Sequence, residues 1–328
     1  MSEQDRVGPC LDEAHLSQKF RVYYQPIVSL ETSRIMGFEA LVRWHSPNRG
    51  FVSAAEVIPV AEDIGLIVPI DWWVLREACR SLRAWQEQFP VNPPLTISVN
   101  LSYRQFLRPS LLLKQIDQIL RETGLDARSL NLEIPKDVLR KNVGSAIAIL
   151  SQLHALGVKL QIDNFGTGYL SLGYLHGFIN TLKIDRAFVS EMGKDDEYLK
   201  IVQASVQSAH DLSLSAIAKG VETLEQLAQL KALRCDYAQG YFFCEPVDSK
   251  GVEALMTADV EAKANLNPFF YAFERLGQLA LNSEGETKLL RVVEVSNTAW
   301  NALAEIGKRQ NKTISQLLEE WALTEGPF

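Results

Sequence analysis

Short apolar segments alternate with longer amphipathic segments through the first 250 residues of the chain. The apolar segments are rich in Leu, Ile, Val and aromatic side chains, as buried strands are. We expect strands over residues 21–30, 35–44, 95–102, 130–135, 159–165, 181–185, 214–218 and 237–243. Apolar positions recur at helical spacing between them, which predicts helices within residues 54–89, 110–125, 143–157, 197–212 and 223–234.

The order of these elements predicts the fold class. A strand followed by a helix, repeated along the chain, indicates right-handed βαβ units and a mostly parallel sheet. Eight such strands over about 230 residues fit an α/β fold of the (β/α)8 TIM-like barrel type. An open doubly wound sheet is the alternative. It would need a glycine-rich phosphate-binding loop after an early strand, and the sequence has none.

The pattern changes after residue 250. Residues 257–287 read as a helical connector, interrupted at Asn267-Pro268. Residues 288–328 read as a strand followed by two helices, and this block is too small to bury a core alone. We therefore expect an N-terminal lead (1–19), a barrel (20–256), the connector and a C-terminal dimerisation or docking unit (288–328).

Composition and charge narrow the class of protein. Of 328 residues, 47% are hydrophobic and 22% charged, which fits a globular chain rather than a disordered one. The net charge of −7 lacks the positive field that drives non-specific nucleic-acid binding. Neither a signal peptide nor a membrane-spanning run is visible. The four cysteines have no CxxC spacing, and we read them as unpaired thiols of a cytoplasmic protein.

Six polar residues interrupt the otherwise apolar strand segments or follow their carboxyl ends. They are Glu39, Asn100, Glu133, Asp163, Asp185 and Glu222. In a parallel barrel the carboxyl ends of the strands converge on one rim, where such folds keep their sites. A single buried carboxylate is as readily a structural residue, but several on one rim repel one another unless cations lie among them. Hard oxygen donors of this kind suit Mg²⁺, Mn²⁺ or Ca²⁺.

Several of these residues fall in motifs that occur in a recognisable order. The motifs are YYQPIV (23–28), FEALVRW (38–44), SVNLS (98–102), LEI (132–134), IDNFGTGYLSLGYL (162–175), LKIDRAFV (182–189), AKGVET (218–223) and QGYFF (239–243). Together they resemble EAL domains, the cyclic-di-GMP phosphodiesterase family, over residues 20–250. The resemblance implies a (β/α)8-type barrel, often with one antiparallel strand. It also implies a cyclic dinucleotide site at the carboxyl ends of the strands.

The resemblance also implies roles for individual residues. Active members hold two divalent ions and hydrolyse one phosphodiester bond with metal-activated water. Carried over by motif, Lys183 would position the water, Arg43 would hold a phosphate and Gln239 would lie near the second metal. The first-metal ligands would be Glu39, Asn100, Glu133 and Asp163. The complete set that we assign to a ligand is Gln25, Glu39, Leu41, Arg43, Asn100, Glu133, Asp163, Lys183, Asp185, Glu222 and Gln239.

Three departures from the family motifs change the expected chemistry. The family's Asp-Asp pair is Asp163-Asn164 here, its AEGVE has Lys219 in place of the first glutamate, and its E-x-T-E loop ends in Lys136. An ammonium and a dication about 4 Å apart repel by about 8 kcal/mol at an effective dielectric of 20. We therefore expect the Lys219 ammonium to occupy the second-metal position. No catalytic residues and no resident metal are then expected, with residual Mg or Mn binding to the remnant ligands as the alternative.

These features together predict a catalytically inactive EAL-domain signalling protein of the bacterial cytoplasm. We favour a cyclic-di-GMP receptor that acts through a protein partner. A nucleotide-independent interaction module, a weak phosphodiesterase and a DNA-binding regulator remain as alternatives. A titration with cyclic-di-GMP, with and without divalent ions, separates the receptor, the nucleotide-independent module and the weak phosphodiesterase.

The C-terminal unit resembles a ribbon-helix-helix, which dimerises through its strand. Residues 288–328 carry five basic and five acidic side chains, so their attraction for phosphate is weak. We therefore expect this unit to support a homodimer rather than to bind DNA. By the resemblance, residues 166–172 (GTGYLSL) would form part of a dimer surface between two barrels.

Overall fold

The computed structural model describes residues 19–46, 50–52, 58, 61–62, 65–141, 143–166, 175 and 177–265. All of them lie in the first of two compact units, residues 1–282 and 283–328. The expected C-terminal unit and most of the connector lie outside the described residues, as do residues 1–18 and 167–172. The predicted domain boundaries therefore stay predictions.

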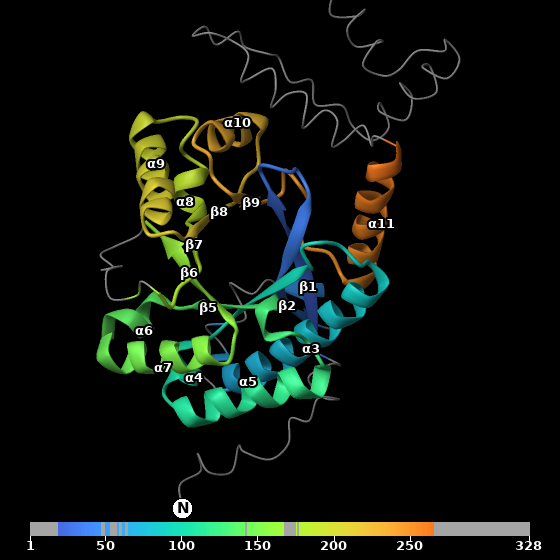
Figure 1. Cartoon of the computed structure of the whole chain (residues 1–328), viewed down its shortest axis with the longest axis vertical. Helices are drawn as coiled ribbons and strands as arrows, with labels where there is room; N and C mark the ends of the chain where they lie inside the picture. The colour runs from blue at the N-terminus through green and yellow to red at the C-terminus, as the bar shows by residue number, and fades with distance from the viewer. Residues whose placement is uncertain are drawn as a thin grey trace, which may run out of the picture. The chain divides into compact units, whose positions relative to one another are not determined.

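Eight strands close into a barrel (Figure 1). Strand β1 (Phe20–Ser29) runs antiparallel to both of its neighbours, β2 (Ile35–Ser46) and β9 (Tyr237–Gln239). Between these neighbours the strands run parallel in chain order: β4 (Thr96–Asn100), β5 (Leu130–Ile134), β6 (Lys159–Phe165), β7 (Thr181–Ile184) and β8 (Ser215–Lys219). The predicted TIM-like barrel with one reversed strand is confirmed. A short strand that the sequence did not predict, β3 (Gly50–Val52), pairs with the end of β2.

Helices cover the outside of the barrel, with α8, α9 and α10 gathered on one side and α3, α5 and α7 on another (Figure 1). The helices are α3 (Ile67–Gln88), α4 (Tyr103–Phe106), α5 (Pro109–Thr123), the 3-10 turn η2 (Ala127–Ser129), α6 (Lys136–Lys141), α7 (Val143–Ala155), α8 (Arg186–Val189), α9 (Asp196–Asp211), α10 (Leu224–Ala232) and α11 (Ser249–Asn265). Helix α11 packs on β1 and runs across the expected boundary at residues 256/257. No helix among these described segments is long and apolar enough to cross a membrane.

Local sequence explains where these helices begin and how they pack. Thr223 and Gln226 form a capping box that starts α10, with each side chain accepting a hydrogen bond from the other residue's backbone N–H. Trp85 of α3 is buried against the barrel, with its ring 4.7 Å from that of Tyr24 and 5.5 Å from that of Phe38. Burial of a large side chain contributes about 1.5–3 kcal/mol, so contacts of this kind hold the helical layer on the barrel.

The parallel barrel strands largely alternate between an apolar outward face and a polar inward face. Outward residues such as Leu132, Leu160 and Leu182 are fully buried in the hydrophobic layer beneath the helices. Inward residues are largely polar, and some bond across the interior. Ser98 on β4 donates a hydrogen bond to Gln161 Oε1 on β6 (3.2 Å), although β5 lies between these two strands. Barrels of this type usually fill their interior with branched aliphatic side chains, so this interior is more polar than is usual for the fold.

The cysteine prediction holds for the described residues. Cys79, Cys235 and Cys244 all carry free thiols. Burial raises the pKa of the Cys79 and Cys235 thiols to about 12, which keeps both protonated and unreactive. Both therefore contribute packing rather than chemistry.

Candidate functional site

A buried ion-pair network lies in the barrel beneath the carboxyl ends of the strands. Lys183 on β7 donates hydrogen bonds from Nζ to Glu39 Oε2 (2.6 Å) and to Glu133 Oε1. Asn100 Nδ2 donates to Glu39 Oε1 at 3.0 Å, and Gln239 Nε2 donates to Glu39 Oε2 at 2.7 Å. Five strands thus bring their polar residues together around Glu39, as the sequence predicted for the rim of a parallel barrel.

Protonation in this network follows from burial and from charge. Burial acts to raise the pKa of Glu39, but the ammonium groups of Lys183 and Lys219 outweigh it and lower that pKa to about 2. Burial and the Glu39 charge raise the pKa of Glu133 to about 8. Burial opposes the charge on Lys183, yet the carboxyl groups of Glu133 and Glu39 raise its pKa above the usual value. The centre of the barrel is therefore a fixed arrangement with a permanent cation between two carboxyl groups.

A second ion pair stands nearer the rim. Lys219, the last residue of β8, donates from Nζ to Asp163 Oδ1 at 2.6 Å and lies 3.4 Å from Asn164 Oδ1. Burial and nearby Lys183 act to lower the pKa of Lys219, but surrounding carboxylates outweigh them and raise it. Asn164 has a left-handed backbone (φ 52°), a conformation that Asn and Asp adopt more readily than most residues. Asn164 therefore fits this left-handed position and presents a neutral amide to Lys219.

Lys136 brings a third ammonium group toward the same carboxylates. It is the first residue of α6, and Pro135 separates it from the end of β5. Burial lowers the pKa of Lys136, while the charges of Asp185 and Asp163 act to raise it. Asp185 itself accepts a hydrogen bond from the backbone N–H of Ala187 (2.9 Å) and caps α8. Asp185 therefore has a local structural role, and its ligand role stays a prediction.

A pocket of about 160 Å³ opens above Lys219 on this rim. The residues that line it are Gln25, Leu41, Arg43, Arg186, Lys219, Gly220, Glu222, Gln239, Gly240, Tyr241 and Pro246. Five residues that we assigned to a ligand are among them. The structure adds Arg186, whose guanidinium pairs with Glu222 (2.9 Å), and Tyr241, whose side chain is 54% exposed. Both stand inside the quoted motifs, next to predicted residues, but nothing in the sequence distinguished them.

Gly220 explains how the segment after β8 reaches the pocket. Its backbone is left-handed (φ +77°), and a Cβ atom there would lie 2.3 Å from Arg186 Cγ. Only glycine therefore allows the turn that carries Lys219 to one side of the pocket and Glu222 to the other.

The four predicted first-metal ligands lie in the same region, but most of their oxygen atoms are already engaged. Both oxygens of Glu39 accept hydrogen bonds, and Asp163 Oδ1 accepts one from Lys219. Glu133 Oε2 is buried without a partner among the described residues. In that same part of the chain, no three Asp, Glu, His or Cys side chains are arranged to hold a metal ion. This donor set, as arranged, does not fit a two-metal centre.

Comparison with known proteins identifies the family. The sequence model of the EAL domain matches residues 10–246. The chain belongs to the EAL domain family. Its EAL domain is 37% identical over 249 residues to the cyclic di-GMP phosphodiesterase NbdA of Pseudomonas aeruginosa. The matched region covers 76% of this chain and 31% of NbdA. It is 34% identical over 258 residues to the oxygen sensor protein DosP of Escherichia coli, covering 78% of this chain and 32% of DosP. The chain thus spans about a third of the length of these relatives.

Solved structures agree with this assignment. The PaMucR phosphodiesterase in complex with c-di-GMP matches this EAL domain with a TM-score of 0.69 and 36% identity, covering 73% of this chain and 96% of the other. The FimX EAL domain from Pseudomonas aeruginosa, bound to c-di-GMP, matches with a TM-score of 0.64 and 25% identity, covering 75% and 97%. Members of the family that resemble this EAL domain therefore include a phosphodiesterase and c-di-GMP complexes.

Proposed function

We propose that this EAL domain is a catalytically silent receptor for cyclic-di-GMP that signals through a protein partner. The observation that carries the proposal is the Lys219 ammonium, 2.6 Å from Asp163 Oδ1. The family resemblance gives that position to a glutamate that binds metal or acts as a base. In this chain a protein cation neutralises Asp163, and no dication is needed to do so.

Charge supports the loss of the second metal. An ammonium and a dication about 4 Å apart repel by about 8 kcal/mol at an effective dielectric of 20. Lys136 adds a further positive charge within electrostatic range of Asp163. Residual Mg or Mn at Glu39, Asn100, Glu133 and Asp163 would have to displace the ammonium groups that now bind those carboxylates. We therefore propose that the domain works without a metal cofactor.

The rim pocket keeps the groups that a cyclic dinucleotide needs. Arg43, Arg186 and Lys219 line it and suit phosphodiester oxygens, which arginine binds with a planar pair of donors. The exposed ring of Tyr241 offers a face on which a base would stack. Gln239 Oε1 is a buried acceptor without a partner among the described residues, and it would accept an N–H of the ligand. Binding thus depends on Arg43, Arg186, Gln239 and Tyr241, which the lysine substitutions leave in place, and on Lys219, which adds a positive charge for phosphate.

The test is a calorimetric titration of the whole chain with cyclic-di-GMP in EDTA, beside a product assay in Mg²⁺ and in Mn²⁺. Saturable binding in EDTA that Arg43→Gln weakens at least about tenfold, with no linear product formation, is the expected result. Absence of binding would favour a nucleotide-independent interaction module. Linear product formation by the unaltered chain would favour a phosphodiesterase.

The homodimer, the protein partner and the cytoplasmic location also remain proposals. We propose that residues 288–328 support the homodimer, since their balanced charge disfavours DNA. Sedimentation of the whole chain and of residues 1–282 tests this, with a tighter dimer expected for the whole chain than for residues 1–282. Tight retention of promoter DNA in a low-salt gel shift would favour the DNA-binding alternative instead.

A further inference from the structure

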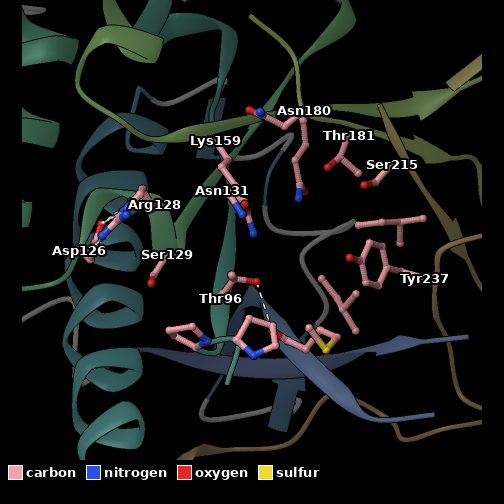
Figure 2. Close-up of a pocket in the computed structure, with 16 residues that line it drawn as sticks. Thr96, Asp126, Arg128, Ser129, Asn131, Lys159, Asn180, Thr181, Ser215 and Tyr237 are labelled. Carbon is pink, nitrogen blue, oxygen red and sulfur yellow. Dashed lines mark hydrogen bonds and ion pairs between the residues drawn. The ribbon is translucent and has the colours of Figure 1, made fainter. Parts of the chain in front are cut away.

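A second cavity opens at the opposite end of the barrel, where the parallel strands begin (Figure 2). Its volume is about 560 Å³, within the range of small-molecule binding sites. No residue that lines it also lines the rim pocket. An inference drawn from this cavity is therefore independent of the proposed receptor function.

One wall of the cavity presents three hydroxyl groups. Thr181, Ser215 and Tyr237 begin the neighbouring strands β7, β8 and β9, and Thr181 and Ser215 are direct register partners. Figure 2 shows the three side chains together on one side of the cavity. Burial raises the pKa of the Tyr237 phenol, so it stays protonated. Among the described residues none of these hydroxyls has a hydrogen-bond partner, so each can both donate to and accept from a ligand.

A group of nitrogen donors lies at the beginnings of β6 and β7. Asn180 Oδ1 accepts a hydrogen bond from the backbone N–H of Leu160 (2.9 Å), and Gln161 Oε1 accepts one from Ser98 (3.2 Å). Each amide therefore keeps its NH₂ group for the cavity that it lines. Lys159, two residues before Gln161, adds an exposed ammonium group at the mouth. These three side chains provide both the hydrogen bonds and the charge that an anion requires.

The net charge of the lining favours an anion. Arg128 and Asp126 neutralise each other through a salt bridge of 2.6 Å and further contacts of 3.1 and 3.2 Å. Lys159 has no ion-pair partner among the described residues, so the lining carries one uncompensated positive charge. A lysine of this kind is a common point-charge contact for phosphate.

The geometry points to a binding site for a pentose phosphate, either free or as part of a mononucleotide. The sugar hydroxyls would meet Thr181, Ser215 and Tyr237, and the phosphate would meet Lys159, Asn180 and Gln161. This end of a TIM barrel ordinarily serves stability. A purely structural role would be met by aliphatic side chains filling the space. Polar groups lining an open cavity instead require water or a ligand to satisfy them.

Calorimetry on the whole chain tests the site with ribose 5-phosphate and with GMP, using ribose and inorganic phosphate for comparison. We expect saturable binding of ribose 5-phosphate at least about tenfold tighter than that of ribose or phosphate. Lys159→Gln and Thr181→Val should each weaken it about tenfold, while Lys200→Gln, a matched change on the exposed face of α9, should not. Tighter binding of GMP would identify the mononucleotide as the ligand, and tighter binding of ribose 5-phosphate the free sugar phosphate.

Two results would overturn the proposal. One is the absence of saturable binding of both compounds at millimolar concentration. The other is binding that Arg43→Gln abolishes while Lys159→Gln and Thr181→Val leave it unchanged, because the compound would then occupy the rim pocket. Circular dichroism melting of each variant separates lost binding from lost folding, and Lys159 is exposed, so its variant should fold normally.

Discussion

Lys183 and Glu39 stand 144 residues apart in the sequence, yet Lys183 Nζ lies 2.6 Å from Glu39 Oε2 inside the barrel. The Lys183 side chain is fully inaccessible, and that of Glu39 is 4% exposed. A charge this deeply buried is tolerated only when it is paired, and removing one partner leaves the other uncompensated. The stability of the barrel therefore depends on this buried ion pair.

Replacement of this lysine should destabilise the protein strongly. Lys183→Met keeps most of the side-chain volume and removes the cation that Glu39 and Glu133 share. We expect the free energy of unfolding in urea to fall by about 3–5 kcal/mol. Lys200→Met on the surface of α9 is the matched control and should change it by less than about 0.5 kcal/mol. A loss below about 1 kcal/mol for Lys183→Met would show that the buried pair is not needed.

Reversal of the rim charges should recover metal binding only in combination. Lys219→Glu removes the ammonium group, but Asn164 still supplies a neutral amide where the family has a carboxylate. The double change Lys219→Glu with Asn164→Asp should therefore bind Mn²⁺ at least about tenfold more tightly than either single change, measured by calorimetry. Lys200→Glu tests for a general effect of added negative charge. Two Mn²⁺ ions bound by the unaltered chain would contradict the expectation.

Asp71 should make stability depend on pH. Burial raises the pKa of Asp71 to about 7. The charge of Glu62 acts in the same direction, and hydrogen bonds with Ser102 act against it. Asp71 Oδ2 has no hydrogen-bond partner among the described residues. Because this pKa exceeds the unfolded value of 3.8, the native state binds more protons between these two values. Stability from this group is therefore present below pH 3.8 and lost as pH rises to about 7.

Asp71→Asn removes that loss. The melting temperature of the variant, relative to that of the unaltered chain, should rise as pH increases toward 7. Above pH 7 the difference between the two melting temperatures should stay constant. Differential scanning calorimetry at several pH values measures this. Asp211→Asn, at the exposed end of α9, should give no such trend. A constant difference from pH 4 to pH 8 would mean that Asp71 keeps an ordinary pKa.

Tyr241 should contribute to nucleotide affinity through its ring. Stacking of a base on an aromatic side chain is worth about 1–3 kcal/mol, so Tyr241→Ala should weaken cyclic-di-GMP binding by about tenfold to a hundredfold. Tyr241→Phe should retain most of the affinity, because it keeps the ring. Leu107→Ala, at another exposed apolar side chain (61%), is the control. Equal affinities for the Ala and Phe variants would exclude a stacking role.

The strands and the rim were predictable because their signals are local. The apolar segment 159–165 coincides with β6, and carboxylates in such segments pointed directly to the network around Glu39. The family resemblance placed Lys183 at the site, but no local signal predicted that it would be buried between two acids. A lysine in a strand ordinarily extends to solvent, and its burial depends on acids from β2 and β5 that only the closed barrel brings to it.

Nothing in the sequence indicated the second cavity, at the end of the barrel where the parallel strands begin. Thr181 and Ser215 are small residues that occur in many strands, and each lies next to apolar neighbours. Their importance comes from facing the same space as Tyr237, which follows from the direct pairing of β7 with β8 and of β8 with β9. Arg186 and Tyr241 were missed for a related reason, since the rim pocket combines residues from the ends of separate strands.

The alternation of polar and apolar positions separates two kinds of evolutionary change. Substitutions at outward positions such as Leu160 and Leu182 change the packing of the hydrophobic layer, whereas those at inward positions such as Lys219 change the charge inside the barrel. The polar interior can therefore vary while the hydrophobic layer that keeps the protein folded stays the same.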